Sequence, residues 1–284
     1  MPTGDFNIVR NFLMGIIPDG KPFASRGGQF AVEDAITVTE SGSKTDRGEL
    51  TFRVNGTSAH FEAGEDSGSE IVDWTMDIEQ EWLDDLLSEL QSDDVVYDVG
   101  ANLGVYSCFV MNKLDSGKVI AFEPYPPNVE QLRRNLDRNE GNYRVIEKAL
   151  SNESTTEGFT SSASSEVGHA TGTIAPGQGC GSEIETIRGD ELVSRDDIPE
   201  PDVVKIDVEG SEPLVLEGLK QTLSELTCRL VYCEIHLPKE DGSRPSVKDY
   251  DSSTEDLKSQ LQKLGYDLEK TVRRNQELHV KARR

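Results

Sequence analysis

The stretch VVYDVGANLGVYS, residues 95–107, joins a short apolar run to an acid, a glycine turn and a second apolar run. Residues 95–99 are rich in β-branched and aromatic side chains, which favours a strand buried on both faces. Gly100 and Gly104 let a ligand approach the backbone, and a helix over residues 105–114 would offer free N–H donors at its start. The stretch therefore predicts a parallel strand, a ligand-binding turn and a helix.

The spacing of this motif differs from that of a dinucleotide fingerprint. G-x-G-x-x-G seats a pyrophosphate on the helix start, but here the order is Asp98-x-Gly100-x-x-x-Gly104, and the acid would repel a pyrophosphate. Asp98 would instead suit the ammonium of an amino-acid moiety. A second apolar run, residues 119–122, ends in Glu123, whose carboxylate could accept hydrogen bonds from ribose hydroxyls. Ammonium and ribose together predict S-adenosylmethionine rather than NAD.

Further polar residues follow other expected strands. Ligands of an open α/β sheet bind at the carboxyl ends of its strands. Strands are expected at residues 143–150, 203–208 and 229–235, and the polar or pocket-facing residues at their ends are Leu150, Asp207, Glu209, Glu234 and His236. Lys205 shares a face with Asp207 and is expected to be its ion-pair partner. The pattern predicts one site built from several strands.

The order of elements predicts the fold class. Helices expected over residues 127–139, 213–223 and 254–264 alternate with the strands, which indicates an α/β fold with a mostly parallel sheet. Residues 266–272 and 277–282 are expected to close it as an antiparallel hairpin. Residues 1–90 are expected to be an accessory segment, β-rich around an Asn55-Gly56 turn and ending in a helix, before a core domain at residues 91–284. The polar residues 151–181 are expected to be a substrate loop or disordered.

Three segments carry a family resemblance: DVGANLGVYS at residues 98–107, AFEPYPPNVEQLRRNL at 121–136 and DVVKIDVEGSEPLVLEGL at 202–219. In this order they resemble the FkbM-type S-adenosylmethionine-dependent methyltransferases, and the resemblance covers the chain from about residue 74 onward. It implies a Rossmann-like class I methyltransferase sheet with an antiparallel C-terminal edge. It also implies O-methylation of a hydroxyl group on a sugar, glycan or small metabolite such as a polyketide.

The resemblance also implies roles for single residues. The methionine side of the cofactor would be lined by Asp98, Gly100, Asn102 and Gly104, the ribose held by Glu123, and the adenine bordered by Ala149, Leu150 and Ser151.

For the acceptor side, His236 is expected to be the general base, because imidazole titrates near neutrality. Asp207 or Glu209 would orient the acceptor, and Glu234 would contact it. Some of these four side chains could also hold a divalent cation, because oxygen-rich sites suit Mg²⁺. The spacing alone does not establish a cation, and the sequence assigns no metal ligand.

Composition excludes several partners. Asp and Glu number 53 against 29 Lys and Arg, a formal charge of −24 that would repel nucleic acids and anionic membranes. No apolar run approaches the roughly 20 residues of a membrane span. The acid excess, spread along the whole chain, predicts a halophilic protein stabilised by salt. Four cysteines without paired spacing and no convincing signal peptide predict a cytoplasmic location.

Two other functions compete with methyl transfer. A catalytically silent fold could bind the same cofactor as a sensor or scaffold. An NAD(P)-dependent oxidoreductase is disfavoured by the missing middle glycine and by Asp98. The sequence does not identify the acceptor. Residues 1–90 could cap the active site or mediate dimerisation, and the sequence does not choose between these roles.

Overall fold

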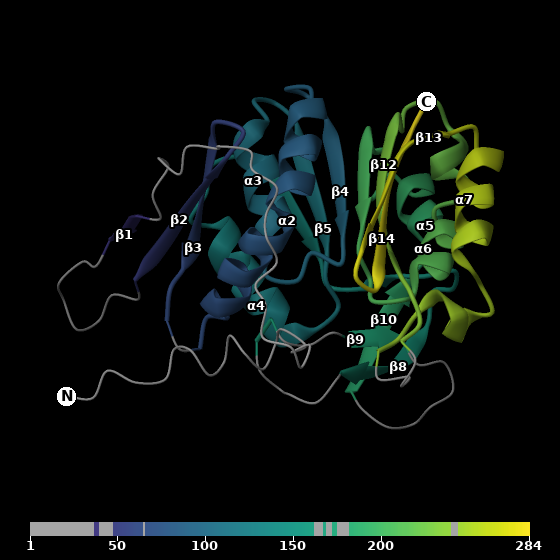
Figure 1. The fold of residues 1–284 in the computed structure, drawn as a ribbon, viewed down its shortest axis with the longest axis horizontal. Helices are drawn as coiled ribbons and strands as arrows, with labels where there is room; N and C mark the ends of the chain where they lie inside the picture. Colours follow the sequence, from purple (N-terminus) through teal and green to yellow (C-terminus); the bar gives the residue numbers. More distant parts are fainter. Residues whose placement is uncertain are drawn as a thin grey trace, which may run out of the picture. The chain divides into compact units, whose positions relative to one another are not determined.

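A seven-stranded sheet forms the centre of the protein. The computed structural model describes residues 37–39, 48–64, 66–161, 167–168, 172–174, 182–239 and 244–284. Along the sheet the strands run β13 (Asp267–Arg274), β14 (Glu277–Arg283), β12 (Leu230–His236), β11 (Val203–Ile206), β4 (Val95–Val99), β5 (Lys118–Phe122) and β6 (Tyr143–Ile146). The five strands from β12 to β6 are parallel, and β14 pairs antiparallel with both β12 and β13 (Figure 1). The predicted α/β class with an antiparallel C-terminal edge is confirmed.

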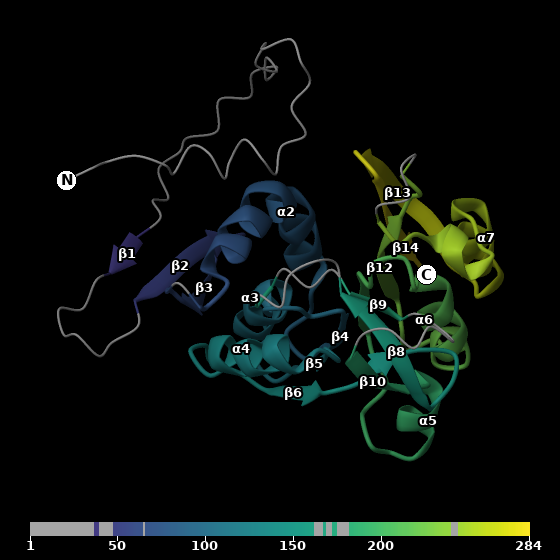
Figure 2. The same cartoon turned by 90° about the horizontal axis from the view of Figure 1, so that it is seen from below.

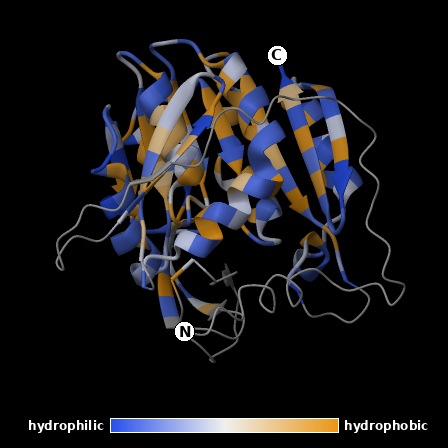
Figure 3. Cartoon of the chain, turned by 60° about the vertical axis from the view of Figure 1, so that its left-hand side comes forward, coloured by the Kyte–Doolittle hydropathy of each residue, from blue (hydrophilic) through white to orange (hydrophobic). Residues whose placement is uncertain are grey.

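Helices cover both faces of this sheet. One face carries α2 (Ser69–Glu89), α3 (Val105–Lys113) and α4 (Pro126–Leu136), and the other carries α5 (Gly189–Ser194), α6 (Glu212–Gly218) and α7 (Thr254–Lys263) (Figure 2). Two short 3₁₀ turns, η1 (Thr222–Ser224) and η2 (Val247–Tyr250), precede β12 and α7. Each layer buries its own apolar cluster against the strands, and Figure 3 shows hydrophobic residues concentrated along the central strands. No helix among the described residues is long and apolar enough to cross a bilayer.

The direction of the strand order reverses at β4. The chain continues from β4 to β5 on one side, whereas β11 lies on the other. Here Gly100 has φ +81°, and a Cβ at that position would lie 1.8 Å from the carbonyl oxygen of Asp207. Only glycine fits this close approach of two chain segments. Such a reversal opens a crevice at the carboxyl ends of the strands, where α/β proteins bind ligands.

The accessory hairpin packs onto the core. Strands β2 (Glu49–Val54) and β3 (Thr57–Glu62) are joined by Asn55 and Gly56, both with the positive φ that a tight hairpin turn needs. The rings of Phe52 and Phe61 lie 6.1 Å apart, and Phe61 contacts Phe109 of α3 at 6.2 Å. β1 (Thr37–Thr39) pairs with β2. Residues 1–36 and 40–47 lie outside the described residues, so the domain division at residue 90 and the oligomer interface stay predictions.

Two expectations about residues 143–187 are wrong. The strand expected over 143–150 is interrupted: β6 ends at Ile146, and β7 (Ala149–Leu150) pairs instead with β10 (Ser182–Ile187). The segment expected to be a loop contains β8 (Thr156–Ser161) and β9 (Gly172–Ile174), which complete a second sheet in the order β7-β10-β8-β9. Phe159 and Ile184 are buried between this sheet and its neighbours. The polar composition of the segment as a whole does not indicate this apolar contact.

Candidate functional site

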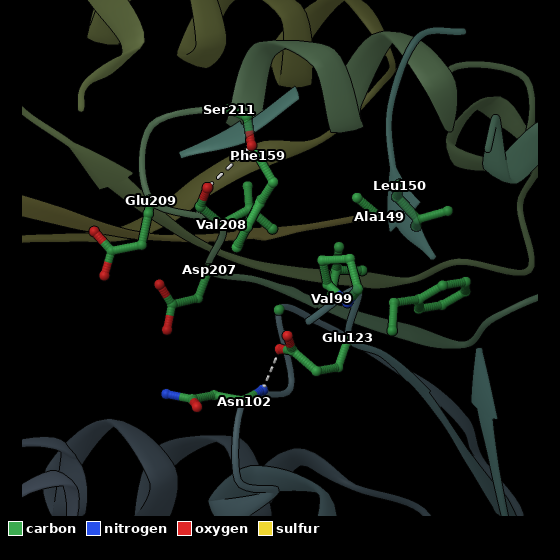
Figure 4. A pocket seen from close by; sticks show the side chains of 13 residues that line it. Val99, Asn102, Glu123, Ala149, Leu150, Phe159, Asp207, Val208, Glu209 and Ser211 are labelled. Atoms are coloured by element: carbon green, nitrogen blue, oxygen red, sulfur yellow. Dashed lines mark hydrogen bonds between the residues drawn. The ribbon is translucent and has the colours of Figure 1, made fainter. Parts of the chain in front are cut away.

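A pocket opens at the carboxyl ends of β4, β5 and β11 (Figure 4). It holds about 690 Å³ of empty space including its open mouth. Seven residues expected from the sequence line it: Gly100, Asn102, Glu123, Ala149, Leu150, Asp207 and Glu209. Five others do not form its wall: Asp98, Gly104, Ser151, Glu234 and His236.

The carboxylate of Glu123 is fixed at the centre of the pocket. The backbone N–H of Asn102 donates to its Oε2 and that of Tyr125 to its Oε1, both at 2.9 Å. Burial raises the pKa of Glu123 to about 7, against the effect of these two donors, which favour the charged form. Each carboxylate oxygen has a second acceptor site. The side chain therefore fits a pair of adjacent hydroxyls such as those of a ribose.

The two ends of the pocket differ in polarity. In Figure 4, Ala149 and Leu150 lie on the side opposite Asp207 and Glu209, with Glu123 between them. Phe159 of β8 adds an aromatic ring, which stacks on Tyr125 with ring centroids 5.9 Å apart. The apolar end fits a flat base. Phe159 was not expected from the sequence, although an isolated aromatic in a Ser- and Thr-rich segment was the available signal.

Asp98 lies beneath the glycine turn. The hydroxyl of Ser107 donates to its Oδ2 at 2.6 Å, and its Oδ1 lies 3.4 Å from Nζ of Lys205. The same Nζ lies 3.3 Å from Oδ2 of Asp207, so Lys205 is ion-paired as the sequence predicts. Burial disfavours the charged amine, but the carboxylates of Asp207 and Asp98 outweigh burial and raise the pKa of Lys205. Asp98 is thus tied to the pocket wall through Lys205.

A second group of side chains surrounds the imidazole of His236, which is completely buried. Its Nδ1 lies 2.5 Å from Oε1 of Glu212, and its Nε2 lies 3.5 Å from Glu209 and 3.7 Å from both Asp207 and Glu234. Burial disfavours the imidazolium, but the charge of Glu212, followed by that of Glu209, raises the pKa of His236 to about 9. Glu212 was not expected from the sequence, although a buried histidine requires a partner and Glu212 begins the adjacent helix.

The remaining charges of this group come from the hairpin and from residue 244. Nε of Arg244 donates to Glu209 at 2.8 Å, and its guanidinium also binds Glu277. Burial, then the nearby carboxylates of Asp207, Glu79 and Glu277, raises the pKa of Glu234. The arrangement combines a fixed hydrogen-bond acceptor for a ribose, an apolar slot and an acidic opposite wall. It can hold a nucleoside beside a second, hydroxyl-bearing molecule.

Known proteins are similar to this chain over more than half of its length. The family model described as "Methyltransferase FkbM domain" matches residues 98–268. The hexuronic acid methyltransferase AglP of Haloferax volcanii is 38% identical over 158 residues, which cover 56% of this chain and 62% of that protein. The 31-O-demethyl-FK506 methyltransferase FkbM of Streptomyces tacrolimicus is 30% identical over 176 residues, 52% of this chain and 67% of that protein.

Proposed function

Because the chain belongs to the FkbM methyltransferase family, we propose that it transfers a methyl group from S-adenosylmethionine to an oxygen atom of a sugar or small metabolite. The observation that carries the proposal is the Glu123 carboxylate, held by two backbone N–H groups between an apolar slot and an acidic wall. The likeness to a hexuronic acid methyltransferase supports a sugar acceptor, in free form or in a glycan.

Different residues of the pocket would contact different parts of the nucleoside. Glu123 would accept the two ribose hydroxyls, and Ala149, Leu150 and Phe159 would contact the adenine. When bound, S-adenosylmethionine supplies a methyl group already activated by its sulfonium charge. The residues therefore have to orient the acceptor oxygen in line with that methyl group and remove its proton.

Asp207 and Glu209 are the carboxylates best suited to meet the acceptor, because both line the pocket. The acceptor hydroxyl would donate to Asp207, and that carboxylate would take its proton. His236 as general base stays a prediction, and its pKa of about 9 argues against it, because a protonated imidazole cannot accept a proton at neutral pH. We instead assign His236 the role of positioning Asp207 and Glu209.

The test is transfer of an isotopically labelled methyl group to neutral sugars, uronic acids and short glycans, with the labelled atom located by mass spectrometry. Asp207→Asn is expected to lower turnover by about 10²-fold or more, in the range of lost acid–base catalysis. Glu140→Gln, an exposed carboxylate at the opposite edge of the sheet, is the matched control and should retain turnover. Binding of S-adenosylhomocysteine without transfer to any acceptor would favour the sensor or scaffold reading instead.

A second variant tests the role of His236. His236→Asn keeps a polar group at Nδ1 and is expected to lower turnover while cofactor affinity stays within about twofold. Near-normal turnover in this variant would exclude His236 from both the base role and the positioning role.

A further inference from the structure

The side chains around His236 form a cluster with the composition of a cation site. Asp207 follows β11, and Glu234 and His236 stand two residues apart at the end of β12. One ligand atom from each of these three residues lies within 4.8 Å of the other two. Oε2 of Glu209 lies 3.5 Å from Nε2 of His236 and accepts from Nε of Arg244.

The imidazole is oriented as in a metal-binding histidine. Both His236 and Glu212 are completely inaccessible to solvent, and Nδ1 lies 2.5 Å from Oε1 of Glu212. Metal-ligating histidines commonly donate their other N–H to a carboxylate in this way. A cation would displace the proton from Nε2 and take its lone pair, while Nδ1 keeps its proton on Glu212. Within the described residues Nε2 has no hydrogen-bond partner, although it is buried and directed at three carboxylates.

The distances leave room for an ion between these side chains. Separations of 3.5–3.7 Å from Nε2 to the carboxylate oxygens are too long for good hydrogen bonds. Two ligands about 2.1 Å from an octahedral ion would be about 3.0 Å apart when adjacent and about 4.2 Å apart when opposite. The observed separations match neither value, so the side chains would have to move closer together to bind an ion.

The charged side chains around His236 also favour a bound cation. Lys205 is shared between Asp98 and Asp207, and Arg244 between Glu209 and Glu277. In the part of the chain that the structure describes, Glu234 shares a hydrogen bond with Glu277 and forms ion pairs only with the imidazoles of His236 and His279. Glu234 therefore has no lysine or arginine partner, and a divalent ion would supply the positive charge.

We propose that Asp207, Glu234 and His236 bind one divalent cation at the acidic end of the pocket. Two carboxylates and one imidazole suit Mn²⁺, since Mn²⁺ accepts oxygen ligands readily and binds imidazole more strongly than Mg²⁺ does. Asp207 lines the pocket, so the cation would stand beside the acceptor and could bind its oxygen atoms. That role rests on the proposed methyl transfer, whereas the cation site itself does not.

A neighbouring cluster provides the internal control. Glu79 and His279 approach the other side of Glu234 and could also form a three-ligand set. Glu79, however, already accepts from the hydroxyl of Tyr106 at 2.8 Å and from Arg274 at 2.7 Å. Both carboxylate oxygens of Glu79 are thus occupied by protein donors, so Glu79→Gln should leave cation binding unchanged.

The experiment titrates the full chain, first stripped with chelator, with Mn²⁺ alone and follows free Mn²⁺ by electron paramagnetic resonance. One Mn²⁺ per chain is expected. Asp207→Asn and Glu234→Gln should weaken binding by at least about tenfold, and Glu212→Gln, which loses the partner of Nδ1, by about 10–100-fold. Circular dichroism of each variant checks that the fold is retained.

Several results would overturn the site: no saturable binding, unchanged binding in Asp207→Asn, or loss of binding in Glu79→Gln. Pulsed electron paramagnetic resonance spectra of the wild-type complex test the site without any substitution. A bound imidazole nitrogen couples to the unpaired electrons of Mn²⁺. Absence of this coupling would refute the assignment of His236 as a ligand. Methyl transfer with and without chelator is measured separately. If the protein binds Mn²⁺ but still transfers methyl groups in the presence of chelator, only the role of the cation in the reaction is refuted.

Discussion

The carboxylate of Glu123 makes cofactor affinity depend on pH. Its pKa is raised to about 7, chiefly by burial, so the side chain is half protonated at neutral pH in the free protein. A carboxylic acid with both oxygens already accepting N–H bonds is a poorer acceptor for two ribose hydroxyls than the carboxylate is. A proton on Glu123 and the cofactor should therefore compete, and affinity should fall as pH falls through about 7.

The size of the effect follows from the protonated fraction. At pH 8 about one tenth of the protein carries the proton, and at pH 6 about nine tenths does, so the dissociation constant should rise about tenfold between them. Titration calorimetry with S-adenosylhomocysteine at fixed ionic strength measures this directly. Its amino-acid charges do not change in that interval, so they do not contribute to the slope.

The control is Glu123→Gln, which is expected to bind more weakly at every pH and to lose the pH dependence. A wild-type dissociation constant that stays within about twofold from pH 8 to pH 6 would refute the reasoning. An equal slope in Glu123→Gln would also refute it, because another group would then be responsible.

Three further outcomes can be measured by unfolding. Gly100→Ala should lower the free energy of unfolding by more than about 2 kcal/mol in urea titration, because its Cβ would lie 1.8 Å from a backbone oxygen, and wild-type stability would contradict that geometry. Lys205→Met should cost about 3–5 kcal/mol in the same assay because it leaves Asp98 and Asp207 without their shared cation, whereas Lys205→Arg should cost less. Thermal scans should show a higher melting temperature in molar salt than in dilute buffer, since salt screens the net charge of −24, and an unchanged midpoint would count against a halophilic protein.

The sequence predicts most of the central sheet because its signals there are local. The apolar strand at residues 95–99, the glycine turn and Glu123 at the end of the next strand each have a short-range pattern, and the structure brings Gly100 and Glu123 into one pocket. The Asn55-Gly56 turn is similarly encoded, since few residue pairs adopt two successive positive φ angles.

The sequence could not predict features that depend on distant partners. Ala149 pairs with Thr186, and the whole Ser- and Thr-rich segment separates these two residues in the sequence. The sequence therefore did not predict the second sheet. Burial was also misjudged. Asp98 lies near the end of one expected strand and His236 directly after another, yet neither side chain forms the pocket wall. Asp98 is paired with Lys205 and His236 with Glu212, and these partners are distant in the sequence.

The two sheets would divide the contacts with the donor nucleoside between them. Glu123, which would accept the ribose hydroxyls, follows β5 of the large sheet, whereas Ala149, Leu150 and Phe159, which would contact the adenine, come from the small sheet. The strand pairings of β4, β5 and β11 do not involve the small sheet. Substitutions in the small sheet could therefore change the fit of the base while the carboxylate that holds the sugar ring keeps its position.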